Sequence, residues 1–314
     1  MPQRVLEPGQ IETLAQRSIP RVRLPDRSRL FARRAERLRT LANGNAIGDY
    51  LTLMAALADA QQSALDGFTP ALPDAARIEL ARTHRMPPIL ATGWNRDERW
   101  RDVLRSLVAT IAAQPGMPPS LLDLCKRLGE ASVDWIDAQA NALLARADTV
   151  DIAAGPFLMA ALQVHWAALT AAFAADRVEP LDVSGVCPLC GTPPVASLVC
   201  AQSPYQGYRY LHCALCATEW HRVRVECTHC GAVGKDVGYH TLQPNDGNDD
   251  GSAAVRAESC EACKSYRKIL YQEKDPGVEP VADDLATIAL DLLLGEHGYH
   301  RASGNPLLWQ ASED

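Results

Sequence analysis

The first part of the chain carries apolar side chains at helical spacing. In one such segment they recur every three or four residues, at Trp100, Val103, Leu104, Leu107 and Ile111. This spacing places them on one face of a helix. Similar stripes predict further helices over residues 28–44, 46–65, 120–128 and 132–147. Proline-rich stretches separate these segments, so we expect an all-α helical domain over residues 1–180.

An uncharged segment, residues 152–175, is long enough to cross a bilayer. However, ten of its residues are alanine, which drives membrane insertion only weakly, and Gln163 and His165 lie near its middle. We therefore expect the central helix of a bundle, beginning near Pro156, and no membrane span.

Beyond residue 180 the pattern changes to short runs of β-branched and aromatic residues. These runs predict strands over residues 195–199, 208–211, 220–225, 237–241, 254–256 and 266–271. The acidic, glycine-rich stretch 245–252 predicts a loop. After Pro280 the helical spacing returns, with Asp283 or Asp284 as the cap and Gly295 as the end.

The predicted fold class is therefore α+β and multidomain. We expect the helical domain over residues 1–180 and two tandem metal-binding ribbon units over 181–275. A C-terminal helix and tail over 276–314 are too short to bury their own apolar stripe, so we expect them to pack back on the rest.

Cysteines are distributed very unevenly along the chain. Residues 1–183 contain only Cys125, whereas residues 187–263 contain nine cysteines. Eight of these nine form four C-x-x-C pairs: Cys187/Cys190, Cys213/Cys216, Cys227/Cys230 and Cys260/Cys263. Each pair predicts a knuckle, a tight turn that directs two thiolates at one ion. Zinc and iron both accept four thiolates, so the eight cysteines predict two four-cysteine metal sites.

The order of the knuckles suggests which pairs share an ion. A knuckle followed by glycine, two strand-like runs and a knuckle without glycine occur in that order twice. This repeat favours the first pair with the second and the third with the fourth, and the crossed arrangement of first with third is the alternative. Most four-cysteine sites are structural, but iron in the same geometry would be redox active. The spacing of the cysteines does not distinguish zinc from iron.

Composition and charge narrow the class of protein. The chain has 314 residues, of which 47% are hydrophobic and 22% charged, so a wholly disordered chain is excluded. The net charge of −7 disfavours a non-specific nucleic-acid binder. Residues 1–39 carry ten arginines and no apolar core segment, so we expect no export and a reducing cytoplasm, where paired cysteines bind metal rather than form disulfides.

Other residues have less specific interpretations. Cys125 and Cys200 are expected to be small buried residues, and the arginines of residues 21–39 to lie on a solvated helix face. The cations near the knuckles are likewise expected on a solvated sheet face: Arg209, Arg222, Arg224, Lys264, Arg267 and Lys268. The sequence contains no glycine-rich phosphate loop, no G-x-S-x-G elbow and no carboxylate pair at catalytic spacing, so we expect no enzymatic activity.

Four segments resemble one known family, the formate dehydrogenase accessory proteins, FdhE. They are GVCPLCGTPPVAS, YRYLHCALCATEWHRVRVECTHCG, ESCEACKSY and the tail DLATIALDLLLGEHGYHRASGNPLLW, and the run LFARRAERLRTLA is similar as well. The resemblance implies a helical domain followed by rubredoxin-like or zinc-ribbon-like units, and metal ligation by all eight paired cysteines. It favours iron and leaves zinc open.

The resemblance also implies a function and a partner. The expected role is that of a cytoplasmic accessory protein in the maturation of respiratory formate dehydrogenase, binding the immature catalytic subunit without joining the final enzyme. One alternative is a rubredoxin-like electron-transfer or thiol-redox protein. A less favoured one is a nucleic-acid-binding zinc ribbon that stacks bases on Tyr208, Tyr210 and Trp220. We expect no nucleic acid among the partners.

Overall fold

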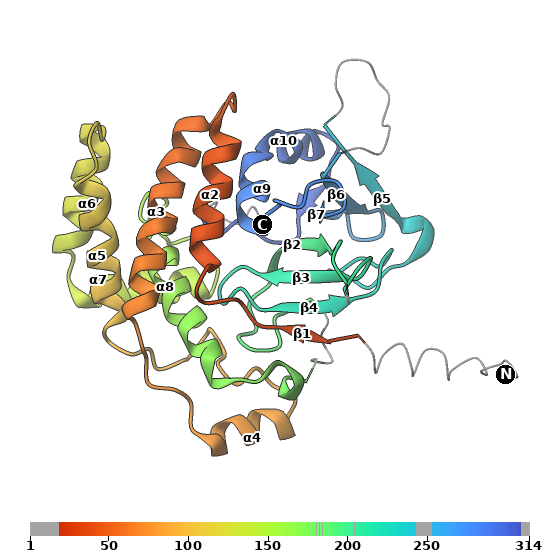
Figure 1. The fold of residues 1–314 in the computed structure, drawn as a ribbon, viewed down its shortest axis with the longest axis horizontal. Helices are drawn as coiled ribbons and strands as arrows, with labels where there is room; N and C mark the ends of the chain where they lie inside the picture. The colour runs from red at the N-terminus through yellow and green to blue at the C-terminus, as the bar shows by residue number, and fades with distance from the viewer. Residues whose placement is uncertain are drawn as a thin grey trace, which may run out of the picture.

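A computed structural model describes residues 19–308 except 180, 182, 184, 204 and 243–252. The predicted loop over residues 245–252 lies outside this part. Figure 1 shows the helices of the first half on one side of the molecule and a twisted sheet on the other. The predicted α+β fold class, with a helical region followed by a part that carries two four-cysteine groups, is confirmed.

Helices form where the apolar spacing predicts them. They are α2 (Leu30–Ala42), α3 (Gly48–Gly67), α5 (Trp100–Ala112), α6 (Pro119–Glu130), α7 (Val133–Leu144) and α8 (Gly155–Leu169). All five residues of the predicted stripe on α5 are buried. The short α4 (Ala75–Thr83) was not predicted, because all of its residues are half-buried or exposed and it has no apolar stripe. The Asp74 side chain caps α4 by accepting from the backbone N–H of Arg77.

The uncharged segment forms α8, which begins beside Pro156 as expected. Every residue of α8 is buried, which explains why the segment is apolar all round rather than on one face. None of the helices in the described ranges combines the length and the apolar character that a membrane crossing requires.

Within the described residues, eight strands form one sheet. They are β1 (Val22–Arg23), β2 (Pro194–Val199), β3 (Arg209–Cys213), β4 (Glu219–Arg222), β5 (Val237–His240), β6 (Val255–Cys260), β7 (Ser265–Tyr271) and β8 (His300–Arg301). Their order is β1-β4-β3-β2-β7-β6-β5, and β8 pairs with β7. Hairpins supply most pairings, but β2 and β7 are parallel and place Leu198 opposite Leu270. The two ribbon-like units therefore share a continuous sheet.

Two predicted strands end three or four residues away from their predicted ends. The strand predicted over 220–225 stops at Arg222, because the chain turns toward the third knuckle and Val225 takes a positive φ of 58°. The strand predicted over 254–256 continues to Cys260.

The C-terminal helix predicted as one segment is two. They are α9 (Pro280–Ala286) and α10 (Ile288–Glu296), and the break falls at Thr287. The predicted cap was also wrong: Glu279 caps α9 by accepting from the backbone N–H groups of Val281 and Ala282. Asp283 and Asp284 are instead buried within α9.

Buried ion pairs attach the C-terminal helices to the rest of the molecule. Figure 1 shows α9 between α2 and the sheet. Arg34 of α2 pairs with Glu279 at 3.1 Å, and Arg37 pairs with Asp283 at 2.6 Å. Arg34 and Arg37 are therefore not on a solvated face, which corrects the expectation for them, because they neutralise carboxylates at this contact.

Candidate metal centres

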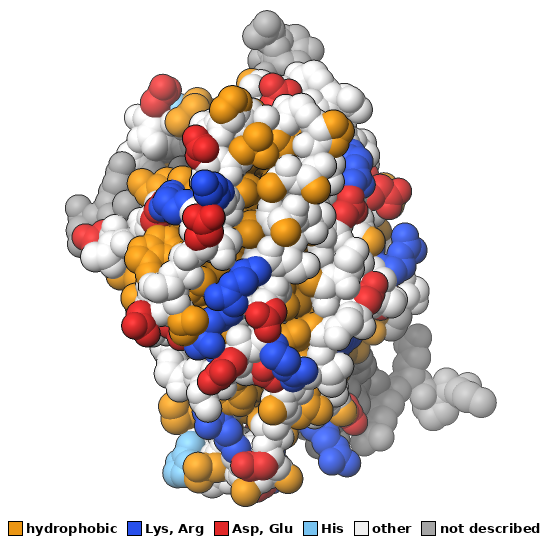
Figure 2. All heavy atoms as spheres, turned by 90° about the vertical axis from the view of Figure 1, so that its left-hand side faces the viewer, with side chains coloured by type: hydrophobic (Ala, Val, Ile, Leu, Met, Phe, Trp, Pro, Cys, Tyr) orange, Lys and Arg blue, Asp and Glu red, His pale blue; other side chains and the backbone are white. Residues whose placement is uncertain are grey.

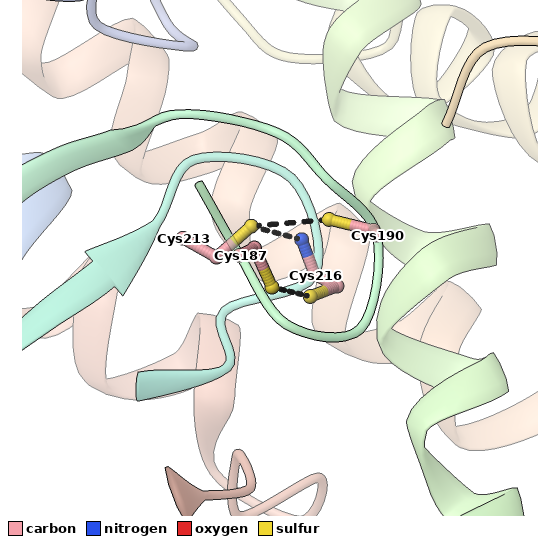
Figure 3. A group of neighbouring side chains, drawn as sticks. All are labelled: Cys187, Cys190, Cys213 and Cys216. Atoms are coloured by element: carbon pink, nitrogen blue, oxygen red, sulfur yellow. Dashed lines mark hydrogen bonds between the residues drawn. The ribbon is translucent and has the colours of Figure 1, made fainter. Parts of the chain in front are cut away.

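The first cysteine cluster joins knuckles from the two ends of a hairpin. Cys187 and Cys190 precede β2, whereas Cys213 ends β3 and Cys216 follows it. Figure 3 shows the four side chains gathered in one place beside a helix. The Sγ atoms of Cys187 and Cys216 are 3.5 Å apart, and those of Cys190 and Cys213 are 3.4 Å apart.

The second cluster repeats this arrangement in the other half of the sheet. Cys227 and Cys230 precede β5, Cys260 ends β6 and Cys263 lies in the turn before β7. Sγ separations are 3.8 Å between Cys227 and Cys263 and 3.7 Å between Cys230 and Cys260. The predicted grouping of first pair with second and third with fourth is confirmed, and the crossed arrangement is excluded for these knuckles.

The spacing of the sulfur atoms fits a tetrahedral metal ion. An ion that binds four thiolates at about 2.3 Å requires the sulfurs to lie about 3.8 Å apart. The observed separations of 3.4–3.8 Å agree with this, whereas a disulfide would need about 2 Å. All eight thiols are free. The donor set and its geometry therefore suit zinc or iron equally well.

Each knuckle depends on one residue with a left-handed backbone. The residue after the second cysteine has a positive φ in all four: Gly191 at 75°, Ala217 at 57°, Gly231 at 81° and Lys264 at 54°. Only glycine takes this conformation freely, so Ala217 and Lys264 each cost about 1–2 kcal/mol. The four knuckles thus share one backbone geometry.

The knuckle backbone also orients the sulfur atoms. The backbone N–H groups of Leu215 and Cys216 both donate to Sγ of Cys213 at 3.4 Å. In the second cluster, the N–H of His229 donates to Sγ of Cys227 at the same distance. Such donors favour the thiolate form that a metal ion requires.

Burial opposes ionisation of these thiols without a cation. It raises the pKa of Cys187 and of Cys213 well above the ordinary thiol value. In the second cluster burial also raises the pKa of Cys263, but hydrogen bonds from Ser265 outweigh it and lower that pKa to about 7. Bound divalent ions would stabilise the thiolates and reverse the effect of burial.

The helical half holds the first cluster through hydrogen bonds that the sequence did not reveal. The backbone N–H of Ile89 donates to Leu189 O at 3.0 Å, and that of Ala91 to Cys190 O at 2.8 Å. On α8, the Gln163 side chain donates to Ala214 O at 2.7 Å. The only hint in the sequence was that Gln163, like His165, is polar within a largely apolar helix.

Several of the nearby cations are buried rather than solvated, which corrects the expectation for them. Arg209 lies against Glu258 at 2.6 Å, Lys268 against Asp291 at 2.7 Å, and Arg267 is enclosed in the sheet region. Arg209 and Lys268 pair with carboxylates because a buried charge needs a partner, whereas Arg267 donates to the hydroxyls of Thr228 and Ser303.

The stacking face of the nucleic-acid alternative is not supported by the geometry. Tyr210 and Trp220 are buried, so they do not form a stacking face. Figure 2 shows cationic and anionic side chains interspersed on the outer face of the helical half, without a basic patch there.

Other cysteines and histidines lie outside the two clusters. Cys125 and Cys200 are buried, as expected, and Arg23 donates to Sγ of Cys200 at 2.9 Å. His212 contacts Glu219 at 3.1 Å, and His240 contacts the Ser259 hydroxyl at 2.8 Å.

Comparison with known proteins identifies the family. Family models described as the N-terminal, central and C-terminal domains of FdhE match residues 19–182, 186–224 and 225–308. The chain is 40% identical to the FdhE homolog of Cronobacter sakazakii over 98% of its length and 97% of that protein.

Two further proteins show the same similarity. FdhE of Escherichia coli K12 is 40% identical, with 96% of each chain covered. A crystal structure of the FdhE protein from Pseudomonas aeruginosa matches with a TM-score of 0.79 and 38% identity, covering 93% of this chain and all of that one. The sequence, the domain order and the fold thus agree, and the chain belongs to the FdhE family.

Proposed function

We propose that this protein is an accessory protein in the maturation of respiratory formate dehydrogenase. It acts in the cytoplasm, without catalytic activity of its own, and binds the immature catalytic subunit of that enzyme. The observation that carries the proposal is the presence of two preformed four-cysteine clusters in a member of the FdhE family. In this proposal the chain comprises a helical domain over residues 1–180, ribbon units over 181–275 and a tail over 276–314.

In this proposal each cluster binds one iron or zinc ion. The ligands are all eight paired cysteines: Cys187, Cys190, Cys213 and Cys216 in the first cluster, and Cys227, Cys230, Cys260 and Cys263 in the second. Zinc would crosslink the small sheet region, whereas iron would add one-electron redox chemistry. Support comes from the sulfur separations, the N–H donors to sulfur and the lack of carboxylate or histidine ligands among the grouped residues that the structure describes.

Affinity isolation from the native cells tests the partner. The tagged protein is purified without oxygen from cells grown with formate, and co-purifying proteins are identified by mass spectrometry. The proposal requires the catalytic subunit of formate dehydrogenase to be recovered without its membrane partners. If cells that make the enzyme yield no such subunit, the proposed partner is wrong.

A variant in the second cluster tests the cysteines themselves. Cys227→Ser combined with Cys230→Ser should abolish one metal site and lower cellular formate dehydrogenase activity while the amount of catalytic subunit stays constant. Cys125→Ser is the matched control, because this thiol lies on α6 away from both clusters. Equal enzyme activity in both strains would contradict a role for the second site in maturation.

A further inference from the structure

The two clusters differ in the residues at the tips of their knuckles. In the first cluster the residues between the cysteines are all buried: Pro188, Leu189, Ala214 and Leu215. In the second cluster only Thr228 is buried, and the others are exposed: His229, Glu261 and Ala262. The sequence differs accordingly, with C-P-L-C and C-A-L-C in one cluster and C-T-H-C and C-E-A-C in the other.

The first cluster lies inside the junction between the two halves of the molecule. All four of its cysteines are at most 1% exposed. Both knuckles are bonded to the helical half, through Cys190 O and through Ala214 O. The first knuckle lies close to the helical half, since a Cβ placed on Gly191 would lie 2.8 Å from Leu90 Cδ1.

The second cluster lies at the surface of the sheet region. Cys230 is exposed and Cys263 is half-buried, whereas Cys227 and Cys260 face the interior. A cavity of about 10 Å³ lies beneath it, lined by residues that include Cys227, Thr228 and Ser265, and a cavity of this size accommodates about one water molecule. Solvent therefore reaches this cluster at Cys230 without any movement of the helical half.

We propose that the second cluster exchanges its metal ion through Cys230, whereas the first cluster retains its ion as part of the core. This inference rests on the two-metal part of the proposed function. In the exchange, a soft donor such as an external thiolate binds the ion as the Cys230 thiolate leaves it, and no electron is transferred.

The two ions should exchange at different rates, because a ligand can reach each of them only after a different part of the structure opens. An incoming ligand reaches the first ion only after two knuckles separate from the helical half, which opens part of the core. The same ligand meets the second ion at an exposed sulfur, and local openings near the surface need far less free energy than openings of the core.

Chelator competition measures the difference. The protein is loaded with two equivalents of zinc without oxygen, and release to a chromogenic chelator is followed with time. We expect two phases of one equivalent each, with the fast phase at least about tenfold faster because it needs only local opening. Two ions released at a single rate would overturn the inference and leave the proposed function standing, whereas a protein that binds no zinc or iron would overturn both.

Alkylation identifies the site that opens. Iodoacetamide transfers its acetamide group to a thiolate sulfur and loses iodide, and mass spectrometry locates the modified cysteines. Cys230 should be modified first and its modification should track the fast phase, while Cys190, the equivalent residue of the first knuckle, remains unmodified. Earlier modification of Cys190 would refute the assignment.

Matched substitutions test the assignment independently. Cys230→Ser should remove the fast phase and leave one slowly released ion in a folded protein. Cys190→Ser should leave the fast phase and remove the slow one. If Cys230→Ser retained the fast phase, the assignment of that phase to the second cluster would be wrong, whether or not Cys190→Ser folds.

Discussion

Gln163 joins the helical half to the first cysteine cluster, and replacing it tests that connection. Its side chain is buried, and its amide donates to Ala214 O in the second knuckle. Its Oε1 accepts from Gln61 at 3.0 Å and from Arg34 at 3.3 Å. The substitution Gln163→Leu removes all three bonds with little change in volume.

The expected loss of stability depends on whether each partner of Gln163 keeps another hydrogen bond or ion pair. Ala214 O loses the donor from α8, which costs about 1–3 kcal/mol for a buried carbonyl. Gln61 still donates to Ala160 O and Arg34 still pairs with Glu279, so each of these bonds contributes only about 0.5–1.5 kcal/mol. We therefore expect Gln163→Leu to lower the free energy of unfolding by about 2–6 kcal/mol.

Urea unfolding followed by circular dichroism measures this effect. Gln114→Leu is the control, because Gln114 is exposed and the same exchange there should change stability by less than about 0.5 kcal/mol. Release of the slowly exchanging ion should also accelerate in Gln163→Leu, since Ala214 is no longer bonded to α8. If Gln163→Leu matched the control within about 0.5 kcal/mol, the bond between α8 and the knuckle would not stabilise the protein.

Two further predictions concern buried charge. Arg34→Met should destabilise the protein by about 3–5 kcal/mol, because it leaves the Glu279 carboxylate buried and unpaired. In the same unfolding assay Arg39→Met, at an exposed ion pair, should cost less than about 1 kcal/mol, and equal effects would refute the argument. Burial lowers the pKa of His165 from 6.5 to about 4 in the folded protein. Between pH 6.5 and pH 4 the unfolded state therefore binds more protons than the folded state. The free energy of unfolding consequently falls as the pH falls through this window. His165→Gln should show a smaller loss between pH 7 and pH 5 than the parent protein, and an unchanged loss would refute the assignment.

The sequence alone determined the features that depend on neighbouring residues. Helices such as α5 follow from apolar spacing, and the knuckles follow from C-x-x-C, with glycine after two of the four pairs. Even the grouping of the knuckles was predicted, because the hairpin between two pairs brings its own ends together. The residues that form these features are close in the chain, so their sequence pattern is enough to predict them.

Only the tertiary structure decided how the two cysteine clusters differ. Nothing in the spacing of Arg37 predicts its pairing with Asp283, 246 residues away, and arginine-rich helices are usually solvated. In the same way, Gln163 and the backbone of Ala91 enclose the first cluster from a distant part of the chain. A sequence pattern predicts local backbone geometry, but the burial of a side chain depends on which distant segments pack against it. For that reason the sequence predicted two four-cysteine groups without distinguishing their burial, whereas the fold enclosed one group and exposed Cys230 of the other.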